Sequence, residues 1–144
     1  SEFVCIRRQL INQLPTWIVN VETYVDLCVH QAGYPVLPSR KVRVVIRLPE
    51  TISDYTAQRR RIYYGHMQIK RFFGQYGSSM EGIVSRNPGL VFRSVVQEIR
   101  LKPRLMLEIW PVLLLDLVAY IGARVDVALG KNHVEWKMIS TTKW

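Results

Sequence analysis

The sequence predicts an α+β fold, a single domain in which a mostly antiparallel sheet of about five or six strands is accompanied by two main helices. Three observations lead to this prediction. Short runs of β-branched and aromatic residues recur along the chain, which is typical of strands. One long segment instead repeats its apolar residues at the helical period, and a second, almost wholly apolar segment follows a proline. Short turns separate most of these runs, as in antiparallel sheets.

The predicted strands are the runs in which β-branched or aromatic residues gather or apolar positions alternate. In the second of them Arg43 and Arg47 share one face, while valines and an isoleucine form the other, buried face. Trp136, on the last strand, is expected in the core. The strands comprise Trp17 to Val29, Lys41 to Leu48, Gly89 to Leu101, Arg104 to Trp110, and a final hairpin whose arms, Val125 to Leu129 and Val134 to Met138, join at Gly130-Lys131-Asn132.

The first predicted helix follows Pro49, which ends the second strand. Thr51 with Asp54 three residues later is a capping pattern, in which the side-chain oxygen accepts a free backbone N–H. Gly74 or Gly77 is expected to end the helix. At 100° per residue its apolar side chains form one narrow arc, and a basic, partly aromatic set lies opposite. The arc consists of Tyr55, Ile62, Ile69, Phe73 and Tyr76, and the opposite set of Arg60, Tyr64, Met67 and Arg71.

The second predicted helix runs from Val112 to Ile121, with Pro111 in its first turn and Gly122 closing it. Leu115 is expected to be buried there. The surrounding apolar stretch, Leu105 to Ala123, is interrupted by two carboxylates and a proline. A membrane-spanning helix needs about 20 nearly uncharged residues, so this stretch is interpreted as a core element.

One globular domain accounts for the whole length. The 144 residues are 49% hydrophobic and 22% charged, ordinary values for a chain that packs a core. The first three residues, Ser1-Glu2-Phe3, resemble a cloning remnant, which leaves residues 4–144 as the domain. No secretion signal opens the chain, and two cysteines without a paired spacing fit a reducing compartment.

Positive charge is concentrated in one part of the sequence. The chain carries a net charge of +9, and the window from Arg40 to Arg71 holds nine basic residues and only two acidic ones. A clustered basic surface indicates an anionic partner, either nucleic acid, acidic lipid or an acidic protein. Arginine suits phosphate because its planar guanidinium donates paired hydrogen bonds, and an aromatic ring between the charges can stack on a base. The predicted anion-binding residues are Arg43, Arg47, Arg59, Arg60, Arg61, Tyr64, Lys70 and Arg71.

Motifs for catalysis or cofactor binding are not found. The sequence has no GxxxxGK[ST] loop, no GxGxxG turn and no GxSxG elbow, and its carboxylates are scattered. Cys28 and His30 share one side of the predicted strand, but a zinc site needs four ligands. We therefore expect a non-enzymatic protein with no cofactor, no metal site and no small-molecule substrate.

The end of the chain carries a family resemblance. A helix running into Tyr120-Ile121-Gly122-Ala123-Arg124-Val125-Asp126 is followed by the turn Gly130-Lys131-Asn132, the strand Val134-Glu135-Trp136-Lys137-Met138-Ile139-Ser140 and the terminus Lys143-Trp144. This order resembles the end of rhabdovirus matrix proteins, a non-enzymatic layer between a viral nucleocapsid and its envelope. A fainter similarity covers Val42 to Asp54 and Phe73 to Ser79. The basic N-terminal arm and the PPxY or PTAP-type motif of that family are missing, and a short middle region is closer to plant-infecting members.

The resemblance implies an α+β fold, self-association, nucleocapsid condensation and binding to acidic membrane. We therefore expect a viral matrix-type structural protein of the virion and host cytoplasm, at the inner face of the membrane. Its partners would be the nucleocapsid or RNA, an anionic membrane surface and further copies of itself. Trp17 and Trp144 are the predicted self-association residues, since aromatic anchors often dominate protein interfaces. An RNA-binding module without a membrane role is the first alternative, and an enzyme without a recognised motif is the second.

Overall fold

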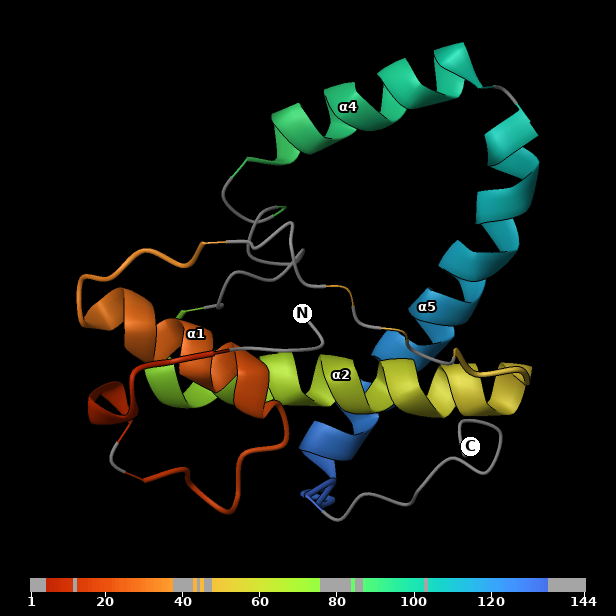
Figure 1. Cartoon of the computed structure of the whole chain (residues 1–144). Helices are drawn as coiled ribbons and strands as arrows, with labels where there is room; N and C mark the ends of the chain where they lie inside the picture. Colours follow the sequence, from red (N-terminus) through yellow and green to blue (C-terminus); the bar gives the residue numbers. More distant parts are fainter. Residues whose placement is uncertain are drawn as a thin grey trace.

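The computed structural model describes residues 5–11, 13–37, 43, 45, 48–75, 84, 87–102 and 104–134. Within these residues the protein is helical, and no strand occurs (Figure 1). A short 3-10 helix, η1, spans Arg8–Leu10. The α-helices are α1 (Val21–Gln31), α2 (Ile52–Phe73), α4 (Pro88–Leu101) and α5 (Arg104–Ala128).

The predicted α+β fold is therefore wrong for the described part of the chain. The segment Trp17 to Val29, expected as a strand, overlaps most of α1, and Gly89 to Leu101 belongs to α4. Arg104 to Trp110 opens α5, and the first hairpin arm, from Val125, is the end of the same helix. The strand predictions for Lys41 to Leu48 and for Val134 to Met138 fall mostly on residues outside the described part, as does Trp136.

The wrong strand predictions have a common physical cause. Residues four apart lie on one face of a helix and also on one face of a strand. Val21, Val25 and Val29 in α1 have this spacing, and so do Val91, Val95 and Ile99 in α4. The four-residue spacing alone therefore does not distinguish a helix from a strand. In α1 the side chain of Asn20 supports the helix, because it accepts a hydrogen bond from the Thr23 N–H (3.3 Å).

The prediction for α2 is confirmed at both ends. The Thr51 hydroxyl accepts a hydrogen bond from the Asp54 N–H at 3.1 Å, so the helix begins at the expected cap. Gly74 ends it with a φ of 72°, a left-handed conformation that glycine adopts without steric cost. Among the predicted apolar arc, Ile69 is fully buried, and Tyr76 lies outside the described residues.

The second apolar helix is longer than predicted. Pro111 lies in the interior of α5 instead of its first turn, and Gly122 continues the helix instead of closing it. Gly130, with a φ of 65°, follows the true end. Leu115, expected in the core, is only partly buried. None of the described helices is long and apolar enough to cross a membrane.

Helix α2 is the centre of the packing, since it contacts both α1 and α5. On one side Ile18 and Leu27 pack against Ile69, with Tyr24 and Phe73 beside them. Helix α4 joins the rest through α5 and lies apart from α1 and α2 (Figure 1). The fold thus has a packed α1–α2–α5 unit and a helix that extends beyond it.

Two glycines allow the helices to approach each other. A Cβ atom at Gly65 of α2 would lie 2.7 Å from the Cβ of Asn20, closer than side-chain atoms tolerate. A Cβ atom at Gly122 of α5 would lie 3.1 Å from the side chain of Arg60. Together with the buried Ala119 and Ala123, Gly122 keeps α5 close to α2. This close approach places the carboxylates of α5 beside the arginines of α2.

Candidate functional site

The three adjacent arginines of α2, predicted to bind an anion, contact three different parts of the protein itself. Arg59 makes a bidentate pair with Asp116 of α5, at 2.8 Å from Nε to Oδ1 and 2.9 Å from Nη2 to Oδ2. The Tyr55 hydroxyl donates to the same carboxylate at 2.9 Å. The Arg59 guanidinium also lies over the Tyr63 ring, 4.9 Å from its centroid. Arg59 therefore joins the first half of α2 to the middle of α5.

Arg60 pairs with Asp126 near the end of α5. Its Nε and Nη2 donate to the two carboxylate oxygens at 2.5 and 2.6 Å. Asp126 has no exposed surface, although the Arg60 side chain is 38% exposed. Lys131 Nζ lies 3.3 Å from Oδ1, and His133 Nε2 lies 2.8 Å from Oδ2. The buried carboxylate thus holds α2, the end of α5 and the segment after α5 together.

Arg61 makes weaker contacts with two loops. Its guanidinium donates to the backbone oxygens of Val19 and His133, each at 3.4 Å. These residues precede α1 and follow α5, so the third arginine links segments that are distant in sequence. Burial lowers the pKa of the Arg61 guanidinium. Arg59, Arg60 and Arg61 therefore act as structural contacts in this fold.

The pKa values of the two aspartates follow from these contacts. Hydrogen bonding from Arg60 is the main reason that the pKa of Asp126 falls to about 2, with burial opposing and His133 and Lys131 assisting. Burial raises the pKa of Asp116, but hydrogen bonds from Arg59 and Tyr55 outweigh it, so the pKa is lowered overall. Both carboxylates are ionised at neutral pH and offset the charge of Arg59 and Arg60. This leaves little free positive charge at the centre of α2.

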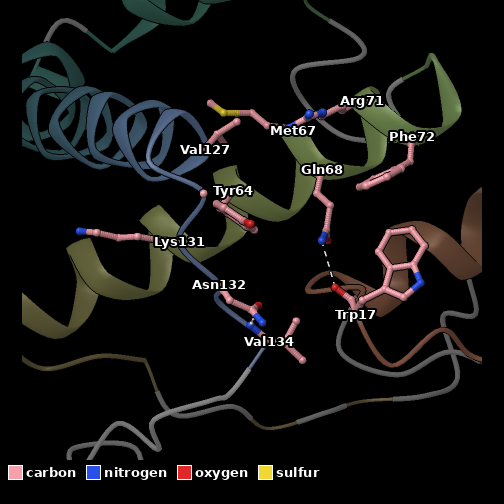
Figure 2. A pocket seen from close by; sticks show the side chains of 11 residues that line it. Trp17, Tyr64, Met67, Gln68, Arg71, Phe72, Val127, Lys131, Asn132 and Val134 are labelled. Carbon is pink, nitrogen blue, oxygen red and sulfur yellow. Dashed lines mark hydrogen bonds between the residues drawn. The ribbon is translucent and has the colours of Figure 1, made fainter.

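Two other predicted residues of α2 lie together in a groove. Tyr64 and Arg71 line a hollow of about 390 Å³ between the second half of α2, the loop before α1 and the turn after α5. Trp17 and Met67 line it as well (Figure 2). The Tyr64 ring also packs against His133, with ring centroids 4.7 Å apart. The groove is open and aromatic, with Arg71 at its border, which suits a flat or apolar group.

Gln68 holds the Trp17 loop beside this groove. Its Oε1 accepts a hydrogen bond from the Val19 N–H at 3.0 Å. Its Nε2 donates to the Trp17 carbonyl, also at 3.0 Å (Figure 2). The Trp17 ring packs on Phe72 at 4.6 Å between centroids. Trp17, a predicted self-association residue, remains 42% exposed. It therefore forms one wall of the groove and stays accessible.

Two further predicted residues that the structure describes do not line this groove. Lys70 is exposed near the end of α2, and Arg43 is exposed in the segment before that helix. Arg47 and Trp144 lie outside the described residues. Within the described ranges, no group of three or more His, Cys, Asp or Glu side chains is placed to hold a metal ion.

Sequence reasoning missed the two aspartates that fix the arginines. Asp116 and Asp126 are the only carboxylates between residues 109 and 130, an otherwise mostly apolar segment. A charge in such a segment is costly to bury unless it is paired, so each aspartate indicated a cationic partner. That signal was present, but the partner lies 57 residues away for Asp116 and 66 residues away for Asp126.

The structure also places large apolar side chains at the surface of α5. The face opposite α2 consists of residues that are each about half exposed, such as Leu117 at 54% and Ile121 at 53%. Leu113, Leu114, Val118 and Val125 belong to the same face. Monomeric proteins rarely leave so many neighbouring large apolar residues exposed, and such patches mark interaction sites. This face, named here the α5 stripe, is a second candidate site.

We compared the chain with protein-family models, with curated proteins and with solved structures, and none of the three comparisons found a match.

Proposed function

We propose that this chain is a non-enzymatic structural protein of the viral matrix type, which self-associates and bridges ribonucleoprotein to an anionic membrane. The observation that carries the proposal is the α5 stripe. A helix that is apolar on all sides is normally buried all round, yet α2 covers α5 on one side only. A further protein surface on the other side would remove the stripe from water.

A second copy of the same chain is the occupant that best fits the α5 stripe. Between Leu113 and Val125 this side of α5 carries one charged residue, Arg124 near its C-terminal end, so the stripe offers little to attract a charged partner. A twofold interface uses the same patch on both subunits, and an apolar stripe is complementary to itself. The overall charge of +9 leaves the rest of the surface suited to an anionic partner.

The groove beside Tyr64 supports the ribonucleoprotein part of the proposal. Aromatic rings next to a cation are the arrangement on which an unpaired base stacks while its phosphate is held electrostatically. Trp17, Tyr64 and Arg71 supply these groups in one hollow. The structural arginines Arg59 and Arg60 are not needed for this contact, since their charges are matched by Asp116 and Asp126.

Sedimentation velocity without nucleic acid tests the self-association directly. We expect the parent protein to form assemblies well above its 16.8 kDa monomer mass. These should persist when the salt concentration rises, because apolar contacts are not screened. The double variant L117Q/I121Q should weaken association by a factor of about 100 or more, since each buried leucine-sized side chain contributes about 1.5–3 kcal/mol.

The control is L37Q, which changes an apolar residue that is 81% exposed and lies outside the stripe. This variant should assemble like the parent, and all variants should keep the parent's helical circular dichroism. A parent protein that stays monomeric at high concentration and low salt would contradict the proposal. The RNA-binding module without a membrane role would then be the better interpretation.

A further inference from the structure

Helix α4 has an apolar face that the rest of the protein covers only in part. At 100° per residue, Val91, Phe92, Val95, Val96 and Ile99 fall on one side of the helix. No residue of α4 is buried. On this face Phe92 is 71% and Val95 is 50% exposed, whereas Val91, Val96 and Ile99 are partly buried. The helix meets the fold through α5 and stands away from α1 and α2 (Figure 1). Its apolar face is therefore available to a partner.

Basic residues lie along one edge of this face and at the junction between α4 and α5. Around the helix axis, Arg93 and Arg100 fall at one edge of the apolar face. Lys102 and Arg104 follow in the sequence, where α4 meets α5. All four are exposed, and among the described residues none of them forms an ion pair with a carboxylate. Glu98 is the only acidic residue of α4. The free positive charge thus lies here and not at the paired arginines of α2.

We infer that α4 and its corner with α5 lie in the headgroup layer of an anionic membrane, with the apolar face toward the acyl chains and Arg93, Arg100, Lys102 and Arg104 on the lipid phosphates. This inference rests on the proposed function, since it names the surface that makes the membrane contact. It also moves that contact from the predicted residues of α2 to α4.

The combination of features favours lipid over the other anions. An interfacial helix has an apolar face with basic residues beside it. Helix α4 has 14 residues, about 21 Å at the helical rise, whereas the hydrocarbon core is about 30 Å thick. RNA would use the cations but leave Phe92 and its apolar neighbours in water. A second copy would use the apolar side chains but bring the arginines of two chains together.

Vesicle flotation tests the inference with the whole chain. The parent protein should float with vesicles that contain phosphatidylserine and bind much less to pure phosphatidylcholine. The variant F92Q/V95Q should lose at least tenfold in vesicle affinity at every salt concentration, because it removes the inserting side chains. The variant R93Q/R100Q should lose roughly tenfold or more in vesicle affinity at low salt and little at high salt. At high salt, screening already removes the attraction between these arginines and the anionic lipid.

The matched control is K70Q/R71Q, which removes two cations of α2 and should bind vesicles like the parent. The R93Q/R100Q variant keeps the apolar face intact, so it carries the test if F92Q/V95Q loses helicity. The inference is overturned if the α4 variants bind vesicles like the parent, or if only the α2 control is weakened. It is also overturned if the α4 variants lose RNA binding or self-association and keep vesicle binding.

Failure of the inference and failure of the proposed function give different results. If the parent binds acidic vesicles and the α4 variants do so equally well, only the location of the contact is wrong. If the parent binds no acidic vesicles, the membrane part of the proposed function fails with it. Sedimentation of the α4 variants without vesicles should match the parent in either case, because the α5 stripe is unchanged.

Discussion

Replacing Asp126 with alanine is expected to destabilise the protein by about 3 kcal/mol, a large fraction of the stability of a domain of this size. The carboxylate is fully buried and is held by Arg60, Lys131 and His133. Its removal leaves the Arg60 charge without its partner. Because the Arg60 side chain is 38% exposed, water solvates part of that charge, which places the effect near the low end of the usual 3–5 kcal/mol. Urea unfolding at pH 7 measures the loss.

The same carboxylate gives the protein an acid-sensitive contribution to stability. The pKa of Asp126 is about 2 in the folded protein and near its ordinary value of 3.8 when unfolded. This difference stabilises the folded state by about 2 kcal/mol at pH above about 4, and the contribution is lost as the pH falls toward 2. In D126N the unfolding free energy should therefore fall less steeply than in the parent as the pH decreases from about 4 to 2.

The control for both measurements is E98A, a change at an exposed carboxylate of α4 that should alter stability by less than about 0.5 kcal/mol. An Asp126→Ala variant with the parent's urea midpoint would show that the α2–α5 pair does not hold the fold together. If the unfolding free energy fell equally steeply with decreasing pH in D126N and in the parent, groups other than Asp126 would be responsible for the acid sensitivity.

Replacing Ile69 with alanine is expected to cost about 2–5 kcal/mol, because it removes buried methyl groups and leaves a cavity. Ile69 is fully buried and contacts Ile18 and Leu27, so the cavity would open where α1 packs on α2. Ile69→Val should cost only about 0.5–1.5 kcal/mol. Ile52→Ala, at a position that is 67% exposed on the same helix, is the surface control. If the Ile69→Ala midpoint in urea matched that of Ile52→Ala, α1 would not be packed on α2 in solution.

Helix α2 was predictable because its signals are local. The Thr51 cap, the acidic first turn and the glycine at position 74 all act within a few residues of the helix ends. Helices α1 and α4 were not predictable in this way. Their valines and isoleucines are spaced by four, which fits both the helical and the strand period, and these residue types favour strands. Helix α5 was misjudged at its ends, because an almost wholly apolar helix carries no period from which to locate its boundaries.

The candidate site was predictable in its residue types and not in its pairing. The count of cations between Arg40 and Arg71 indicated an anionic partner, and for Arg59 and Arg60 the anion is supplied by α5 of the same chain. Charge counted along a sequence does not reveal partners 57 or 66 residues away. Tyr64 and Arg71 were found because they recur at helical spacing, whereas Trp17 joins them only through the tertiary fold.

Flotation of a labelled single-stranded RNA with phosphatidylserine vesicles tests the bridging function most directly. A protein that bridges ribonucleoprotein to membrane must bind both partners at once. We expect the RNA to rise with the vesicles only when the protein is present, and to remain at the bottom with R93Q/R100Q at low salt. RNA that stays at the bottom although the protein binds it in solution would contradict bridging and favour an RNA-binding module without a membrane role.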